Sequence, residues 1–221
     1  MEAVLKVGGS LAEDPASLTR LCQELSVLAK AHRILIVPGG GEFADTVRKL
    51  DKKYSLSNTV AHKMAILAMD QYGFFLSDIT PNAYVSYSLE ETRNSLREML
   101  PIFLPSKIMF REDPLEHSWD VTSDTIAAYI AGLLQAEKLI LVTDVDGIFS
   151  EDPKKTFDAT CIEELPAKTL LGWNKRTSVD KTLPKMLLQT KLDCYVVNGR
   201  HPERIKQILE NKKTVYTHVT V

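Results

Sequence analysis

Two glycine clusters and one lysine near the start of the chain have the residue types that can bind phosphate. Lys6 precedes the cluster Gly8-Gly9-Ser10, and the second cluster is Gly39-Gly40-Gly41. Each cluster follows a short apolar run typical of a buried strand, at residues 3–7 and 34–37, and precedes a helical pattern. Backbone amides at the positive end of a helix form an anion site, and phosphate is the usual anion. The two clusters therefore predict two phosphate groups brought together.

Tight turns between a strand and a helix also favour glycine, so a purely structural role stays open for either cluster. Lys6 favours the phosphate interpretation, because an ammonium within an apolar strand needs an anionic partner. The spacing matches neither the P-loop nor the Rossmann glycine fingerprint. We therefore expect a phosphate-binding fold of another kind.

The composition favours chemistry on small molecules. The chain has 221 residues, of which 44% are hydrophobic and 25% charged, with a formal net charge of -2. These values indicate a globular protein and predict neither nucleic-acid nor membrane binding. The three scattered cysteines form no CxxC pair, and we see no leader pattern and no apolar run of membrane-spanning length. We expect reduced thiols and a cytoplasmic protein.

Strand and helix patterns alternate along the chain. Apolar residues repeat at helical spacing over residues 15–31, between the first two strands. Further helices are predicted at residues 43–53, 57–71, 89–99, 123–134, 179–190 and 202–210, and further strands at 101–104, 139–143, 195–198 and 215–221. This order predicts an α/β fold with a mainly parallel sheet and helices on both faces. Residues 105–119 are interpreted as an irregular segment at a boundary between two lobes.

Two further segments carry polar side chains in positions suited to a ligand. Asp124 falls in the first turn of a predicted helix, where it either complements the helix dipole or orients lysines around a phosphoryl group. Thr143 and Asp144 end a buried strand, and ligands of open α/β sheets gather beyond the carboxyl ends of strands. A calcium loop at Asp144–Gly147 is disfavoured because the EF-hand spacing is missing.

These motifs, in this order, resemble those of the amino acid kinase superfamily, and they span the chain: Lys6-x-Gly8-Gly9-Ser10, Pro38-Gly39-Gly40-Gly41, Thr122-Ser123-Asp124-Thr125 and Thr143-Asp144-Val145-Asp146-Gly147-Ile148-Phe149 with Asp152-Pro153. The resemblance implies a single domain, residues 1–221, with the αβα three-layer sandwich of that superfamily. It implies an acceptor lobe at about residues 1–118 and a nucleotide lobe at 119–221. It also implies ATP as co-substrate with Mg²⁺.

Residue roles follow from the same resemblance. Lys6 would contact the transferring phosphoryl group, Asp124 would orient the catalytic lysines, and Lys185 would be the second lysine with Lys181 in reserve. The nucleotide pocket would be lined by Gly8, Gly9, Ser10, Thr143, Asp144, Gly147, Phe149 and Asp152, and the acceptor would meet Gly39, Gly40, Gly41, Arg48 and His117. Such a set suits phosphoryl transfer, which mainly needs placement and charge neutralisation.

The strings at residues 38–43, 116–119 and 196–204 resemble the subfamily of methanofuran biosynthesis, whose acceptor is a phosphorylated aminomethylfuran. The phosphate of this acceptor would need cations such as Arg48 or Lys63, and its ammonium would need a carboxylate. Its furan ring could pack on Trp119 or His117. The carboxylate candidates are Glu42, Asp45, Asp70 and Asp120, whereas His62 is interpreted as a helix-surface residue. Uridylate kinase, isopentenyl phosphate kinase and a non-catalytic nucleotide sensor stay open. We expect a homo-oligomer.

Overall fold

Strand β1 (Ala3–Val7) lies near the middle of an eight-stranded sheet and is covered on both faces. The computed structural model describes residues 1–94, 99–151, 156, 158–173 and 177–221. β1 pairs in parallel with β2 (Ile34–Pro38) and with β5 (Lys138–Thr143), so that Lys6 lies opposite Val37 on one side and Leu141 on the other. Strands buried on both faces are near-continuous apolar runs, which explains why these three were predicted from the sequence.

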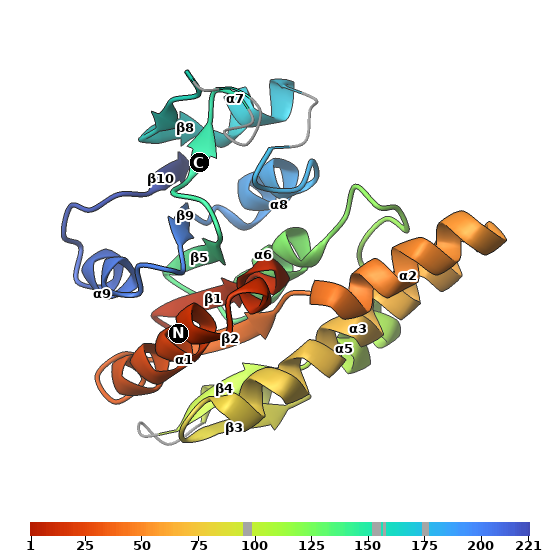
Figure 1. Ribbon diagram of the computed structural model, residues 1–221, viewed down its shortest axis with the longest axis horizontal. Helices are drawn as coiled ribbons and strands as arrows, with labels where there is room; N and C mark the ends of the chain where they lie inside the picture. The colour runs from red at the N-terminus through yellow and green to blue at the C-terminus, as the bar shows by residue number, and fades with distance from the viewer. Residues whose placement is uncertain (95–98, 152–155, 157, 174–176) are drawn as a thin grey trace.

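The sheet order is β3-β4-β2-β1-β5-β9-β10-β8, and among the described strands of this sheet only the β9–β10 pair is antiparallel. In Figure 1 the strands run from β3 and β4 at the bottom to β8 at the top. The remaining strands of the sheet are β3 (Ala83–Ser86), β4 (Leu100–Phe103), β8 (Glu164–Pro166), β9 (Cys194–Asn198) and β10 (Thr217–Thr220). A separate hairpin pairs β6 (Ile148–Phe149) with β7 (Cys161–Ile162). The α/β fold with a mainly parallel sheet is confirmed.

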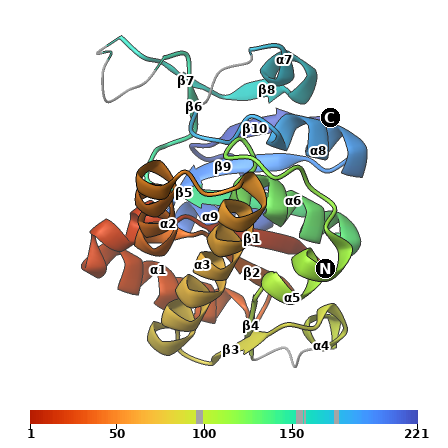
Figure 2. The same cartoon turned by 90° about the vertical axis from the view of Figure 1, so that its right-hand side faces the viewer.

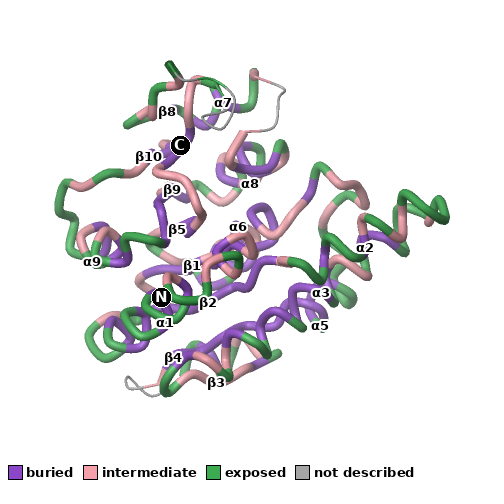
Figure 3. The backbone as a smooth tube through the Cα atoms, in the orientation of Figure 1, coloured by how far each residue is buried: buried purple, intermediate pink, exposed green. Residues whose placement is uncertain are grey.

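Helices cover the two faces of this sheet as two apolar clusters. Alternate residues of β1 point to opposite faces: Leu5 packs with α1 (Pro15–Leu28) and α9 (Glu203–Leu209), and Val4 packs with α6 (Ser123–Leu133) and α8 (Leu183–Thr190). The central strands are correspondingly buried in Figure 3. Three layers result, and the side chain of Lys6 shares the α6 face with Val4.

Two long helices extend from one end of the sheet. They are α2 (Gly41–Tyr54) and α3 (Asn58–Ile79), which pack against each other in Figures 1 and 2. The shorter helices are η1 (Gly9–Glu13), α4 (Leu89–Arg93), α5 (Ser106–Glu112) and α7 (Ala167–Gly172). In the ranges that the structure describes, no helix is long and apolar enough to span a membrane.

The segment 105–119 is not irregular throughout, because α5 begins within it. Asp70 of α3 holds the start of α5: its carboxylate accepts a hydrogen bond from the Ser106 backbone N–H at 3.2 Å and another from the Ser106 hydroxyl. Burial raises the pKa of Asp70, and the bonds from Ser106 oppose that rise. Asp70 therefore has a structural role here, in place of the contact with an acceptor that was one expectation. The helix predicted at residues 89–99 ends at Arg93, and residues 95–98 lie outside the described ranges.

Candidate active site

A cleft of about 1030 Å³ opens at the carboxyl ends of β1, β2 and β5. Its floor contains Lys6 and residues of both glycine clusters, one wall comes from α2 and α3, and the other comes from the start of α6 and the end of β5. Parallel strands place their carboxyl ends at one edge of the sheet, so motifs far apart in the sequence meet there. Most of the side chains predicted to do chemistry line this cleft.

Lys6 and Asp124 form an ion pair at the centre of the cleft. The Lys6 Nζ atom lies 2.7 Å from Asp124 Oδ1, and the two side chains are only 13% and 8% exposed. Asp124 is the second residue of α6, and its backbone N–H donates to the hydroxyl of the N-cap residue Thr122 at 3.4 Å. The carboxylate thus lies at the positive end of α6 and beside an ammonium. The anionic partner that was expected for Lys6 is therefore Asp124, a residue of the protein itself.

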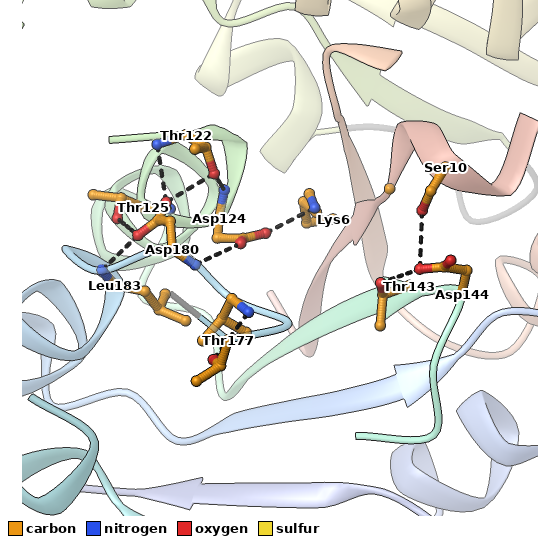
Figure 4. Close-up of polar contacts among 12 residues, drawn as sticks. Lys6, Ser10, Thr122, Asp124, Thr125, Thr143, Asp144, Thr177, Asp180 and Leu183 are labelled. Atoms are coloured by element: carbon orange, nitrogen blue, oxygen red, sulfur yellow. Dashed lines mark hydrogen bonds and ion pairs between the residues drawn. The ribbon is translucent and has the colours of Figure 1, made fainter. Parts of the chain in front are cut away.

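Asp180, which sequence analysis missed, holds Asp124 in place. The Asp180 backbone N–H donates to Asp124 Oδ2 at 3.1 Å, so both oxygens of Asp124 have partners (Figure 4). The carboxylate of Asp180 accepts hydrogen bonds at 2.7–3.1 Å from backbone N–H groups or hydroxyls of Thr122, Thr125, Thr182 and Leu183. Burial and the nearby Asp124 raise the pKa of Asp180, and the bonds from Thr125 and Thr122 oppose this. The signal available in the sequence was an aspartate just before a helix with proline in its first turn.

The two glycine clusters touch each other. A Cβ atom placed on Gly9 would lie 2.1 Å from the Gly41 Cα atom, and one on Gly39 would lie 2.9 Å from the Gly9 nitrogen. Gly41 also has a φ of +52°, which favours glycine. Gly8, Gly9, Gly40 and Gly41 line the cleft, whereas Gly39 packs beneath Gly9 and is not a lining residue. The two clusters therefore meet, and the binding of two phosphate groups beside them stays a prediction. Gly39 contacts the protein backbone.

The end of β5 and the loop after it form the side of the cleft predicted to bind nucleotide. The Ser10 hydroxyl donates to Asp144 Oδ1 at 3.2 Å, and the Thr143 hydroxyl donates to the same oxygen at 3.3 Å (Figure 4). These three residues and Phe149 line the cleft. Gly147 is not a lining residue, and a Cβ atom there would lie 2.4 Å from Thr217 Oγ1. The small size of Gly147 allows it to pack against β10. Asp152, which was also predicted to line the nucleotide pocket, lies outside the described residues.

The opposite side of the cleft, between α2 and α3, carries both signs of charge. Arg48 lies 2.7 Å from Asp45 Oδ1, and its guanidinium stands 4.9 Å from the ring centroid of Trp119. The Trp119 indole N–H donates to Asp51 Oδ2 at 2.7 Å. Arg48, Asp45 and Trp119 line the cleft together with Glu42 and Lys49. This side therefore offers cations, carboxylates and an aromatic ring to one small molecule.

The sequence of residues 1–198 matches the sequence pattern of the amino acid kinase family. The chain belongs to this family. It is 41% identical over 218 residues to [5-(aminomethyl)furan-3-yl]methyl phosphate kinase of Methanocaldococcus jannaschii, which covers 98% of this chain and 96% of that protein. It is 27% identical over 227 residues to the uridylate kinase of Methanococcus aeolicus, covering 96% of both chains. The resemblance inferred from the motifs is confirmed, and the chain is a kinase, a phosphotransferase.

Solved structures of the family share the fold. The uridylate kinase of Archaeoglobus fulgidus superposes with a TM-score of 0.78 at 22% identity, covering 100% of both chains. UMP kinase from Bacillus anthracis superposes with a TM-score of 0.75 at 17% identity, covering 99% of this chain and 95% of that one. These likenesses show that the three-layer sandwich is the fold of the amino acid kinase family.

Several residues expected at the kinase site lie outside the cleft lining. His117 stacks behind His62, with ring centroids 4.7 Å apart, and Lys63 lies 5.8 Å from the Phe110 ring centroid. Lys185 is exposed in the first turn of α8, and the exposed Lys181 lies 3.2 Å from Asp120 Oδ1. Neither lysine lines the cleft, so a catalytic role for Lys185 stays a prediction.

The interpretation of His62 as a helix-surface residue is wrong, because His62 is 7% exposed and lines the cleft.

The donor set fits a metal ion that arrives with a substrate. In the part of the chain that the structure describes, no group of three or more His, Cys, Asp or Glu side chains could hold a metal ion. Mg²⁺ usually binds one or two carboxylates together with substrate phosphates and waters. Asp124 and Asp144 line the cleft and supply carboxylates of that kind. The site therefore suits Mg²⁺ carried by a nucleotide.

Proposed function

We propose that the chain transfers the γ-phosphoryl group of ATP to a small phosphorylated acceptor. The best candidate is [5-(aminomethyl)furan-3-yl]methyl phosphate, the acceptor named for the relative that is 41% identical over 98% of this chain. An oxygen of the acceptor phosphate would bond to the γ-phosphorus as the bond to ADP breaks, which yields a diphosphate and ADP. The observation that carries this proposal is the buried Lys6–Asp124 pair beside the joined glycine clusters.

The residues of the cleft can supply what phosphoryl transfer needs. Lys6 provides a positive charge where negative charge is shared between the attacking and leaving oxygens. The backbone N–H of Gly9 would lie beside it, whereas the Gly8 N–H donates to the Val142 carbonyl at 2.8 Å. Asp124 fixes the Lys6 ammonium at 2.7 Å, and Asp180 fixes Asp124. Mg²⁺ would neutralise phosphate charge when it is bound. A phosphate oxygen is already an anionic nucleophile, so no general base is required.

Substrate placement follows from the two sides of the cleft. ATP would lie toward Ser10, Thr143, Asp144 and Phe149, and the acceptor between α2 and α3. On this placement the acceptor lobe would be about residues 1–118 and the nucleotide lobe 119–221, and Ser10 and Trp119 would lie where the two lobes meet at the cleft. Because ATP is the co-substrate, we place the reaction in the cytoplasm.

The acceptor side suits a molecule with a phosphate, a ring and an ammonium. Arg48 and Lys49 supply cations, and Glu42 and Asp45 supply carboxylates. Ala65, Ile66 and Met69 line the same cleft from α3 and supply apolar groups. UMP is the second candidate acceptor, favoured by the uridylate kinase that is 27% identical over 96% of this chain. A non-catalytic nucleotide sensor would have no need of the Lys6–Asp124 pair.

We also propose that the chain forms a homo-oligomer through α3. Val60, Leu67 and Phe74 are 46%, 44% and 50% exposed, and they recur at intervals of seven residues. Seven residues make nearly two helical turns, so these side chains form one apolar stripe along the helix. A second copy of the same stripe would cover it, as in isologous dimers. Sedimentation velocity of Leu67→Glu against the unmodified chain tests this directly.

A coupled assay of ADP release with Mg-ATP tests the activity. The acceptor panel contains the aminomethylfuran phosphate, UMP, AMP and isopentenyl phosphate. Preference for the furan phosphate, with a diphosphate product, supports the proposal, and preference for UMP replaces the acceptor but keeps the reaction. ATP binding without ADP release against every acceptor would favour the sensor. In the same assay, Lys185→Ala and Lys181→Ala distinguish the two candidates for the second catalytic lysine.

A further inference from the structure

His62 and His117 form a stacked pair at the wall of the acceptor side. Their ring centroids lie 4.7 Å apart, with an angle of 25° between the ring planes. His117 is held at both nitrogens: Nε2 lies 2.8 Å from Asp113 Oδ1 and Nδ1 lies 2.9 Å from Thr59 Oγ1. A carboxylate only accepts hydrogen bonds, so His117 carries a proton on Nε2. His117 is therefore a fixed platform for the ring of His62.

His62 differs from His117 because the protein gives its ring no hydrogen-bond partner among the described residues. The residue is only 7% exposed, yet no fully buried side-chain nitrogen or oxygen in the described ranges lacks a partner. The ring nitrogens of His62 are therefore not fully enclosed, and His62 is one of the residues that line the cleft. An imidazole that is largely desolvated and unpartnered favours a ligand that restores its hydrogen bond.

The place of His62 along α3 identifies which end of an acceptor it meets. Tyr72, ten residues further on, donates its hydroxyl to the Gly8 carbonyl at the glycine clusters. Ten residues of α-helix span roughly 15 Å, so His62 lies well away from the phosphate end of the cleft. Ala65, Ile66 and Met69 line the cleft between these two positions. An acceptor with its phosphate at the glycines would extend past this apolar face toward His62.

We propose that His62 is a specificity-determining residue of the acceptor site, whose ring nitrogen accepts a hydrogen bond from a primary ammonium of the acceptor while His117 fixes the ring. This inference rests on the proposed function and adds the residue that distinguishes an aminomethyl-bearing acceptor from one without the amine. The Asp113 carboxylate, 2.8 Å from His117 Nε2, supplies a negative charge beside the histidine pair. Burial lowers the pKa of His62, and His117 lowers it further, which keeps the ring neutral and able to accept.

Steady-state kinetics with two acceptors tests the proposal. One acceptor is the aminomethylfuran phosphate, and the other is the same molecule with a methyl group in place of the aminomethyl group. His62→Phe keeps the stacked ring but cannot accept, and His62→Gln keeps an acceptor without the ring. We expect His62→Phe to raise KM for the amine about 10- to 100-fold, with kcat and KM for ATP nearly unchanged. KM for the methyl analogue should change less than about 3-fold, and His62→Gln should recover part of the loss.

The possible outcomes distinguish a failure of the role proposed for His62 from a failure of the proposed reaction. An equal rise of KM for both acceptors would show a packing role for His62, and no rise for either would show no contact; each result overturns the inference while the proposed function stands. If the unmodified chain phosphorylates UMP but neither furan, the proposed acceptor and this inference both fail. His117→Ala should raise KM for the amine by a smaller factor, and His117→Phe should restore it. Thermal unfolding of each variant identifies any change that comes from loss of the fold.

Discussion

The backbones of Gly9 and Gly41 meet so closely that a Cβ atom on Gly9 would lie 2.1 Å from the Gly41 Cα atom. The residues come from the loops after β1 and β2, which are neighbours in the sheet. Their contact merges two strand-to-helix turns into one floor of backbone beside Lys6. A side chain on Gly9 would separate the loops and with them the two anion sites. A Cβ atom on Gly41 would lie 3.5 Å from the Gly9 Cα atom, so the φ of +52° is what favours glycine there.

Gly9→Ala tests the joined floor. The methyl group would overlap the Gly41 backbone, so the loops must move apart and the phosphate groups lose their alignment. We expect kcat/KM to fall at least about 100-fold and the free energy of unfolding to fall by about 1–3 kcal/mol. Gly172→Ala is the matched control, because a Cβ atom there meets nothing within 4 Å. It should leave ADP release unchanged and alter stability by less than about 1 kcal/mol. Equal activity of the two variants would contradict the close-contact argument.

Lys6→Ala should lower turnover far more than ATP affinity. The ammonium is expected to interact most strongly as charge moves in the transition state, so kcat should fall about 100- to 1000-fold while KM for ATP changes less than about 3-fold. Lys107→Ala, an exposed residue of α5, is the control in the ADP-release assay. Removing Lys6 also leaves Asp124 buried without its cation, which is destabilising. The double variant Lys6→Ala, Asp124→Asn removes that charge, and recovery of full turnover in it would exclude Lys6 from catalysis.

Asp180→Ala should destabilise the nucleotide side of the cleft. The substitution leaves the backbone N–H groups of Thr122, Thr125 and Leu183 without their carboxylate acceptor in a buried site. Each such group costs about 1–3 kcal/mol, so we expect a loss of about 3 kcal/mol or more in the free energy of unfolding, measured in urea. Asp180→Asn keeps one acceptor oxygen and should lose less. Asp120→Ala removes an exposed ion pair with Lys181 and should change stability by less than about 1 kcal/mol. A similar small loss in Asp180→Ala would show that water replaces the carboxylate.

The order of elements could be predicted because it depends on local patterns. The buried strands β1, β2 and β5 are uninterrupted apolar runs, and α1 shows helical spacing of its apolar residues. The short elements were missed because distant residues hold them. Helix α5 depends on Asp70, 36 residues before Ser106, and β8 pairs with β10, more than 50 residues later in the chain.

The same distinction between local patterns and contacts of distant residues applies to the candidate site. Lys6, Asp124 and the glycines could be proposed because residue type and motif order identify them, and the structure brings them into one cleft. Asp180 and His62 could not, because their roles depend on partners 55 to 58 residues away in sequence. Gly147 was assigned to nucleotide by its motif, whereas its neighbour in space is Thr217. Local patterns identify which residues can do chemistry, and tertiary contacts decide which of them do.

His62 should make the stability of the fold depend on pH. Burial and the facing groups His117 and Lys63 lower its pKa below the ordinary value of 6.5, whereas Asp113 opposes them. Between the folded-state pKa and 6.5 the unfolded chain binds more protons than the native chain, so stability rises with pH and falls as the solution is acidified through that window. We expect the free energy of unfolding, measured in urea at pH 7.5 and 5.5, to differ less in His62→Phe than in the unmodified chain. His201→Gln alters an exposed histidine paired with Glu203 and should leave the difference unchanged. The same difference in the unmodified chain and in His62→Phe would show that His62 takes up protons equally in the folded and unfolded states, and that the cleft leaves its ring hydrated.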